Sequence, residues 1–388
     1  MNLRSFKVRA SKTLLHFGVG VLRGVEELLR RFRRVYIVSS RSAARVSGAL
    51  SDVEQMLKGS GIAYEVFDRI TPNPLASTVN TLAERIWRFG AEAVIAIGGG
   101  SVIDSAKIAS VIACCGGFVE DYVRGSKEPR GSLPVVAINL THGTGSEVNR
   151  YAVVTLENPR TKLAIASEYT YPLASVDDPQ YLRTLPKSQT MYTAFDAFYH
   201  ALEASCGADS SPYVLALAEE AVKNIVKWLP LALKDPGNAE ARYWLLYASM
   251  LAGIAIDNSR AHIIHAMENV LSGINTELPH GAGLAMLGPA AVKHLYRAVP
   301  EPLHRILKYL DPGLEPSPEY AERAAEAVKR FHAEMGFRES LRAYGFTEQE
   351  AEKVIDTVFN YLSYALKLSP VEPSRELLKE MYLSALGY

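Results

Sequence analysis

The sequence predicts an α/β domain, with a parallel sheet and helices on both of its faces, followed by an all-α domain. Short β-branched runs alternate with helical patterns up to about residue 183. One of these runs enters a glycine-rich turn that opens a helix, and strand patterns stop after residues 177–179. Alternating strands and helices form parallel sheets that are covered on both faces. We therefore expect one domain over residues 1–183 and a helical domain over 184–388, with a cleft between them.

The candidate strands of the first half are short apolar runs. They cover residues 35–39, 64–67, 94–97, 135–139 and 152–156, and helical patterns cover 41–57 and 77–89. Ligands of parallel sheets bind outside the carboxyl ends of the strands.

The second half has almost continuous helical periodicity. Helices are expected over residues 188–205, 213–229, 239–256, 280–295, 321–335 and 348–366. Prolines at 212, 230, 236, 279, 300, 316 and 370 are expected to mark the joints between helices.

Composition excludes several classes of function. The 388 residues are 48% hydrophobic, enough for sizeable cores, and 42 basic residues balance 42 acidic ones. No basic excess favours nucleic acid, and the cluster Arg30, Arg31, Arg33 and Arg34 suits the end of a helix better than a binding patch. No signal peptide or membrane span is visible, and the three cysteines form no CxxC motif. These features predict a cytoplasmic protein.

The most informative segment is VIAIGGGSVIDSAK at residues 94–107. Gly98, Gly99 and Gly100 remove every Cβ from the turn, so a ligand can lie on the backbone where the new helix aims its N–H groups and positive dipole. A phosphate is the best fit. Ser101 is expected to cap the helix, with Asp104 reaching back as in a capping box. The spacing is not GxGxxG, and a turn that binds nothing is the alternative.

A second group of residues has the chemistry of a metal site. Asp196 and His200 are four residues apart in the apolar helical pattern TAFDAFYHALEA, so they share one helix face. His265 and His280 lie in similar apolar segments, and one carboxylate with three imidazoles suits Zn²⁺ or Fe²⁺. The spacing leaves His262 open as a competing ligand, and a helix-surface Asp–His pair is the structural alternative.

Four motifs together resemble the iron-containing (group III) alcohol dehydrogenase family. They are GGGSVIDSAK at 98–107, THGTGSE at 141–147, DAFYHALEA at 196–204 and HAMENVLSG…PHG at 265–281. The resemblance implies an NAD(P)-binding domain over 1–183, a helical metal-binding domain over 184–388, reversible alcohol oxidation and a homodimer. It also implies that Asp196, His200, His265 and His280 bind one divalent metal, Fe²⁺ or Zn²⁺.

The resemblance further assigns the cofactor-binding residues. Residues 98–101 correspond to the pyrophosphate cradle, and Thr141, Thr144 and Ser146 to a second loop at the cofactor phosphate and nicotinamide. Lys162 is similar to the family's cofactor-side lysine, and Asn73 to its cofactor-edge asparagine.

The chain departs from the family at the end of the first strand. NAD-preferring members carry an Asp that bonds the ribose 2′-OH, whereas this chain has Ser39, Ser40 and Arg41. Two hydroxyls and a guanidinium suit a 2′-phosphate, which predicts NADP(H) in preference to NAD(H). The alternative is a solvated Arg41 at a helix start.

Two further departures concern histidines. Asn269 stands where many members have a second His that is often assigned to proton relay, and His262 could replace it or could be only a packed helix residue. His142 stands where small residues are usual. It could bind the 2′-phosphate, line the substrate pocket or only fill space.

The predicted function is a metal-dependent alcohol dehydrogenase or aldehyde reductase that transfers a hydride between NADP(H) and a small, uncharged alcohol or aldehyde. Tyr151, Leu163 and residues 258–262 are expected to form an apolar substrate pocket. Alternatives are a glycerol or glycerol-phosphate dehydrogenase, a 3-dehydroquinate synthase-like lyase of the same superfamily, and a nucleotide sensor without enzymatic activity. Few Cys, abundant Arg and Glu, and short loops fit a thermophilic source.

Overall fold

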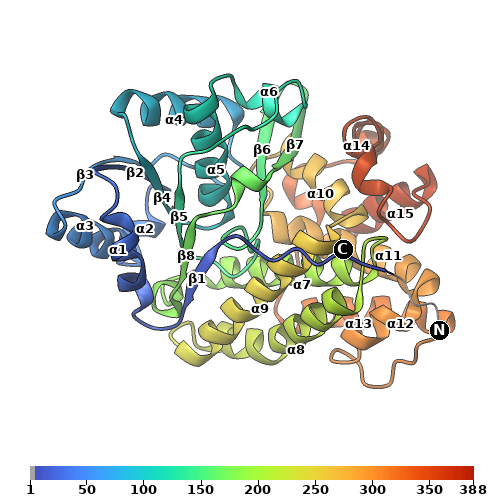
Figure 1. The fold of residues 1–388 in the computed structure, drawn as a ribbon. Helices are drawn as coiled ribbons and strands as arrows, with labels where there is room; N and C mark the ends of the chain where they lie inside the picture. The colour runs from blue at the N-terminus through green and yellow to red at the C-terminus, as the bar shows by residue number, and fades with distance from the viewer. Residues whose placement is uncertain (1–4) are drawn as a thin grey trace.

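A computed structural model describes residues 5–388 and divides the chain into a sheet half and a helical half (Figure 1). The sheet half contains six parallel strands in the order β1-β8-β5-β4-β2-β3. These strands are β1 (Leu14–Phe17), β2 (Arg34–Ser39), β3 (Ala63–Phe67), β4 (Ala93–Gly98), β5 (Val135–Asn139) and β8 (Ala174–Asp177).

Helices cover both faces of the sheet because its buried strands are apolar on both sides. In β2, Tyr36 and Val38 pack into the core formed with α4 (Ala76–Phe89) and α5 (Gly100–Cys115). The alternate residues Val35 and Ile37 pack into a second core, formed with α1 (Glu26–Leu29) and α3 (Ala49–Gly59). This confirms the predicted doubly covered parallel sheet.

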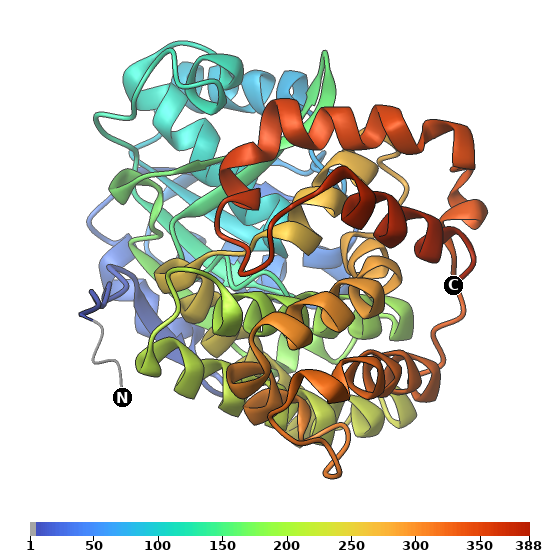
Figure 2. The ribbon, with the colours of Figure 1, turned by 90° about the vertical axis from the view of Figure 1, so that its right-hand side faces the viewer.

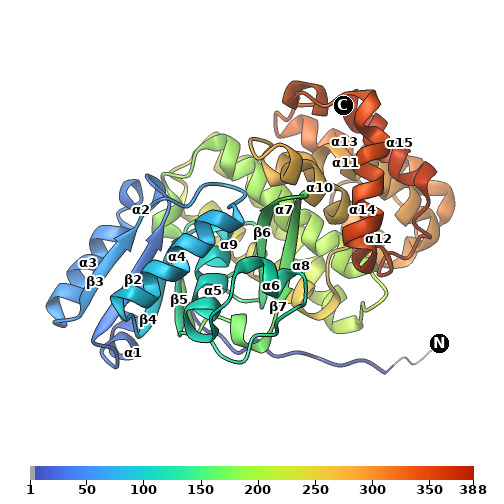
Figure 3. The ribbon, with the colours of Figure 1, turned by 90° about the horizontal axis from the view of Figure 1, so that it is seen from above.

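One expected strand belongs to a different sheet. The run at 152–156 does form a strand, β6 (Tyr151–Glu157), but it pairs antiparallel with β7 (Arg160–Ala166). It is therefore not part of the alternating parallel sheet. A tight connection of two residues permits this hairpin, whereas a parallel neighbour would need a crossover. In Figure 3 the hairpin lies between the sheet and the helical half.

Several expected boundaries also move. The helix expected over 41–57 is broken at Gly48, whose φ of 85° separates α2 (Ala43–Val46) from α3. Pro230 lies inside α8 (Pro212–Lys234) and does not mark a joint, whereas the helix expected over 280–295 does continue through Pro289, in α11 (His280–Ala298). Strands β1 and β8 and helices α12 (Pro300–Leu307) and α15 (Arg375–Leu386) were not expected.

The helical half fills the rest of the chain (Figure 2). Its other helices are α7 (Lys187–Cys206), α8 (Pro212–Lys234), α9 (Ala239–Ser259), α10 (Ile263–Ile274), α11 (His280–Ala298), α13 (Ala321–Glu334) and α14 (Ala351–Leu366). The boundary proposed at residue 183 falls between a 3-10 turn that ends at Leu182 and the start of α7. Among residues 5–388, no helix is long and apolar enough to cross a membrane.

The hairpin joins the two halves. Helix α10 packs against β7 at Gly273, where an added Cβ would lie 2.6 Å from the Cα of Thr161. Only glycine permits this approach, and it sets Lys162 of β7 against the side chains of α10.

Two buried histidines make the fold sensitive to acid. Burial lowers the pKa of His142 and of His332 to about 3, whereas an unfolded imidazole titrates near 6.5. The unfolded chain then binds more protons, so the free energy of unfolding should fall as pH falls from about 6.5 toward 3, by up to about 1.4 kcal/mol per pH unit for each group. Denaturant unfolding across this pH range measures the slope. His332→Phe should make the slope shallower, and an unchanged slope would contradict this assignment.

Candidate active site

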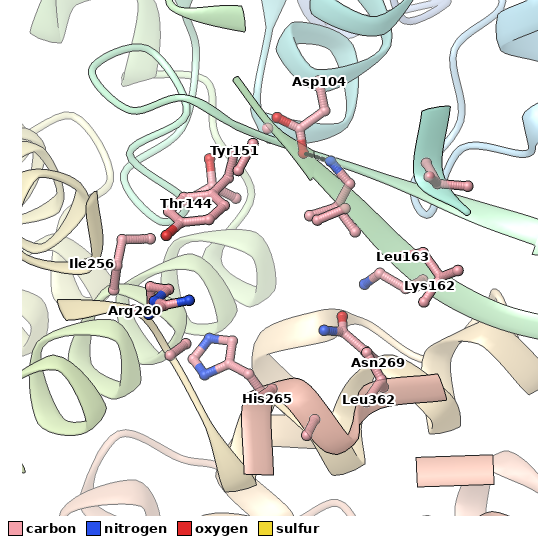
Figure 4. Close-up of a pocket in the computed structure, with 18 of the residues that line it drawn as sticks. Asp104, Thr144, Tyr151, Lys162, Leu163, Ile256, Arg260, His265, Asn269 and Leu362 are labelled. Atoms are coloured by element: carbon pink, nitrogen blue, oxygen red, sulfur yellow. Dashed lines mark hydrogen bonds between the residues drawn. The ribbon is translucent and has the colours of Figure 1, made fainter. Parts of the chain in front are cut away.

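A cavity of about 770 Å³ lies between the start of α5, the β6–β7 hairpin and the helices α9, α10 and α14. Figure 4 shows Thr144 and Tyr151 on one side of it, Lys162 and Leu163 on the hairpin, and His265 and Asn269 on α10. The cavity therefore brings together residues from both predicted domains.

The first turn of α5 forms one end of the cavity. The helix begins at Gly100 after the N-cap Gly99, so Ser101 is not the N-cap that the sequence suggested. The glycines also serve close packing, since a Cβ at Gly99 would lie 2.7 Å from the Thr141 side chain, and one at Gly100 would lie 2.4 Å from that of Thr144. Gly100, Ser101 and Thr144 line the cavity, whereas Gly98, Gly99 and Thr141 do not. The first N–H groups of the helix have no partner within it, as an anion site requires.

Asp104 does not close a capping box. Its carboxylate accepts hydrogen bonds from the Ser146 hydroxyl (2.5 Å) and the Val153 N–H (2.9 Å). The buried Lys107, one turn later, donates to Ser146 Oγ (2.8 Å) and to the carbonyls of Asn149 (2.9 Å) and Tyr151 (2.8 Å). Together these two side chains attach α5 to residues 146–153. Ser146 therefore lines the cavity as predicted but is held by α5.

The residues expected to select the cofactor follow β2. Ser39 pairs in register with Ile97 of β4, so Ser40 and Arg41 follow the strand beside the glycine turn. The Ser39 side chain is buried, whereas Arg41 is exposed. These three residues do not line the described cavity.

Asn73 and Lys162 meet at the far wall of the cavity. Asn73 has φ 50° and donates to the Thr276 and Leu278 carbonyls, while its Oδ1 accepts from Lys162 Nζ at 3.0 Å. The same ammonium lies 3.1 Å from Ser272 Oγ and 3.3 Å from His280 Nδ1.

The three expected histidine ligands converge on one carboxylate oxygen of the fourth, Asp196. Asp196 Oδ1 lies 3.4 Å from His200 Nδ1, 3.7 Å from His265 Nε2 and 3.6 Å from His280 Nε2. The ligand atoms of Asp196, His265 and His280 all lie within 4.8 Å of one another. His200 stacks on His265 with ring centroids 4.5 Å apart. Burial would raise the pKa of Asp196, but the three imidazoles hold it well below its usual value.

This arrangement fits a divalent cation. Atoms that bind one such ion tetrahedrally at about 2.1 Å lie about 3.4 Å apart, close to the 3.4–3.7 Å between Asp196 Oδ1 and the imidazole nitrogens. His200 is not part of the compact group of Asp196, His265 and His280. Within the described chain, Asp196 Oδ1, His200 Nδ1 and His265 Nε2 are buried and have no hydrogen-bond partner. Buried polar atoms are normally satisfied, so three unsatisfied ones that converge are best explained as metal ligands.

Two carboxylates that support this group were not predicted. Glu203 contacts His265 Nδ1, and Glu268 contacts His280 Nδ1. Each lies three residues after a candidate ligand, at His200 and His265, and that spacing was the only signal in the sequence.

His262 lines the cavity, whereas His142 does not. His262 Nε2 lies 3.1 Å from the Glu203 carbonyl, and its Nδ1 lies 3.0 Å from the Glu203 carboxylate. The proton-relay role of His262 stays a prediction. His142 is buried between Thr193 Oγ1 (3.1 Å) and Arg242 Nη1 (3.3 Å), and does not line the cavity. It fills space and bridges α7 to α9.

Comparison with known proteins places this site in a family. The model for "Iron-containing alcohol dehydrogenase" matches residues 13–179, and the model for the C-terminal part of the "Fe-containing alcohol dehydrogenase family" matches residues 190–386. The chain belongs to the iron-containing alcohol dehydrogenase family. Membership confirms the resemblance found in the sequence. It makes the protein an oxidoreductase of the alcohol dehydrogenase type, with a divalent metal and a nicotinamide cofactor.

Individual relatives agree over nearly the whole chain. The long-chain primary alcohol dehydrogenase AdhA of Thermoanaerobacter ethanolicus is 36% identical over 97% of this chain and 96% of its own. Among solved structures, the Red Sea brine pool alcohol dehydrogenase ADH/D1 has a TM-score of 0.94 at 26% identity, over 99% of this chain and 100% of its own. The NADH-dependent butanol dehydrogenase A of Thermotoga maritima has a TM-score of 0.90 at 29% identity, over 98% of each chain.

Proposed function

We propose that this family member reduces aldehydes and oxidises the corresponding primary alcohols, transferring a hydride between NADP(H) and a small or alkyl-chain substrate without charge. One observation carries the proposal. The Asp196 carboxylate, with three imidazole nitrogens within 3.7 Å, adjoins a cavity whose other end is the first turn of α5. A metal site and a phosphate site on one cavity are what hydride transfer between an alcohol and a nicotinamide requires.

Each residue group has a role in the proposed reaction. A divalent cation, Fe²⁺ or Zn²⁺, held by Asp196 and the three histidines would supply Lewis-acid chemistry that lowers the pKa of the substrate hydroxyl. The N–H groups of the first turn of α5 would bind the cofactor pyrophosphate. Thr144, Ser146, Asn73 and Lys162, which line the same cavity, would hold and orient the nicotinamide. The hydride would then pass between the carbinol carbon and nicotinamide C4.

The cavity wall supports an uncharged substrate. Leu163, Ile256, Leu362, Ala365 and Leu368 form an apolar surface around the histidines. Of the four cations that line it, Arg260 binds Asp209 (2.6 Å), Arg150 lies near Asp257 (3.8 Å) and Lys162 lies near Glu268 (3.7 Å). The fourth, Arg124, is exposed and donates to the Asn158 carbonyl (2.7 Å). Cations already paired with carboxylates are poorly placed for a polyanion, which argues against glycerol phosphate and against a 3-dehydroquinate synthase-like reaction. The names of the long-chain alcohol and butanol dehydrogenase relatives agree with an alkyl substrate.

The NADP(H) preference rests on Ser40 and Arg41 beside the glycine turn. An exposed guanidinium at this end of β2 can pair with a 2′-phosphate, and no carboxylate in residues 39–41 would repel one. With NADPH as the donor, aldehyde reduction is the favoured direction. The homodimer implied by the family would be checked by light scattering on the same preparation.

One assay series tests the proposed function. The purified protein is analysed for bound metal and assayed with straight-chain aldehydes and alcohols, using NADPH and NADH, before and after treatment with a chelator. We expect activity to disappear with the metal and to return with Fe²⁺ or Zn²⁺, and kcat/KM to be higher with NADPH. Activity that survives complete removal of the metal would refute the chemistry, and a clear NADH preference would refute the role of Arg41.

A further inference from the structure

Each of two candidate metal-binding imidazoles is backed by a buried glutamate. Glu203 on α7 contacts Nδ1 of His265, and Glu268 on α10 contacts Nδ1 of His280. Both glutamate side chains are fully buried. The opposite nitrogens, Nε2 of His265 and of His280, lie 3.7 Å and 3.6 Å from Asp196 Oδ1. A carboxylate at Nδ1 holds the proton there and leaves the Nε2 lone pair directed at the metal site.

Glu203 also fixes the start of α10. One of its oxygens accepts the N–H of Ile264 at 2.8 Å, and the other lies 3.3 Å from the N–H of His265. A carboxylate at a helix N-terminus suits both the free N–H groups and the dipole. The backbone and the ring of His265 are therefore oriented by the same group.

Each glutamate has its own buried cationic partner. Both ring nitrogens of His262 face oxygens of Glu203, the carbonyl at 3.1 Å and the carboxylate at 3.0 Å. Nε2 also lies 3.5 Å from Cys206 Sγ. Burial lowers the pKa of His262, but the nearby Glu203 carboxylate outweighs this effect and raises the pKa to about 10, so the ring is an imidazolium at neutral pH. Lys162 Nζ lies 3.7 Å from the Glu268 carboxylate. These two cations come from different elements, the α9–α10 connection and the β6–β7 hairpin.

We propose that Glu203 and Glu268 are positioning residues that fix the tautomer and direction of His265 and His280, and that His262 and Lys162 balance their buried charges. This inference rests on the metal site of the proposed function. The three carboxylates at 196, 203 and 268 and the two cations leave one net negative charge before a metal binds. A divalent ion then makes the centre positive by one charge, which suits an oxygen that develops negative charge.

The test measures metal affinity and not only turnover. Glu203→Gln and Glu268→Gln are titrated with Zn²⁺ against a competing chelator and with Co²⁺, whose visible absorption reports ligand geometry. The control is Glu339→Gln, a carboxylate of the helical half that binds Tyr192 and Tyr344. We expect both site variants to bind metal about 10- to 100-fold more weakly, with an altered Co²⁺ spectrum, while the control resembles the wild type.

The Glu268→Gln variant keeps the test decisive if Glu203→Gln fails to fold. Both Glu203 oxygens accept N–H groups, so the amide introduced by Glu203→Gln would face a donor in either orientation, and a melting curve would show the resulting damage. Glu268 Oε1 has no hydrogen-bond partner among the described residues, so an amide group of similar size there would face no N–H donor. Wild-type affinity and an unchanged Co²⁺ spectrum in Glu268→Gln would overturn the inference. If the wild-type protein itself binds no metal, the proposed function fails instead.

Replacing the cationic partners, His262 and Lys162, should not weaken metal binding. Because His262→Gln and Lys162→Met remove a positive charge near the centre, metal affinity should stay the same or rise. Weakening as large as that in the glutamate variants would overturn the charge-balancing role. The pH–rate profile of His262→Gln separates this role from proton relay, which would remove one limb of the profile, whereas charge balance would not.

Discussion

Replacing Asp196 with Asn is expected to lower kcat/KM by about a thousandfold or more and to remove the bound metal. Asp196 Oδ1 is the atom around which the three imidazole nitrogens converge, and among residues 5–388 it is the only carboxylate oxygen that they share. A Lewis acid contributes several kcal/mol to such a transition state, and about 4 kcal/mol corresponds to a thousandfold. Metal content by elemental analysis and kcat/KM with a primary alcohol measure the two effects.

A matched exposed carboxylate provides the control. Asp356→Asn on α14 removes a carboxylate whose side chain is 58% exposed and bonds Arg375, away from the cavity. It should keep wild-type metal content and activity. An Asp196→Asn protein that folds, binds one equivalent of metal and retains activity would show that the cation lies elsewhere.

Replacing Lys107 with Met is expected to destabilise the fold by about 3–5 kcal/mol, because it removes one partner of a buried charge pair and leaves the other uncompensated. The ammonium donates to Ser146 Oγ and to the carbonyls of Asn149 and Tyr151. Burial lowers its pKa to about 8, an effect that the nearby carboxylates of Asp104, Glu147 and Asp257 oppose. Met has a similar length but leaves these acceptors unsatisfied.

The Lys107→Met variant should also bind the cofactor more weakly, because residues 146–151 adjoin the proposed cofactor site. Denaturant unfolding measures the stability change, and a fluorescence titration with NADPH measures the dissociation constant, which should rise. Lys187→Met, an exposed lysine at the start of α7, is the control and should change neither quantity. A Lys107→Met variant with unchanged unfolding free energy would show that these hydrogen bonds contribute little.

The sequence predicted best what depends on local pattern. The runs at 35–39, 94–97 and 135–139 became strands because consecutive apolar residues suit a sheet that is buried on both faces. Strand partners are set by contacts distant in sequence, so pattern alone placed β6 in the wrong sheet and missed β1, the edge strand that pairs with β8. Pro230 and Pro289 lie inside helices because tertiary packing overrides the local penalty.

In the site, too, local pattern predicted some residues, whereas contacts distant in sequence determined others. The residues that meet around Asp196 could be named from spacing and resemblance. The partners of those residues could not, because Glu203 and Glu268 look like ordinary helical glutamates until the fold brings them to imidazole nitrogens. Asp104 illustrates the limit most clearly, since a local capping role was plausible but its carboxylate bonds Ser146 and Val153, more than 40 positions away.

The hairpin is attached on both of its sides, and this restricts how substrates can enter and leave. Asp104 and Lys107 bind β6 to α5, while Gly273 lets α10 lie directly on β7. A wide hinge motion between the halves would have to break one of these attachments. Substrates are therefore expected to enter and leave beside α14, where the cavity-lining residues Tyr361 and Tyr364 are 42% and 53% exposed.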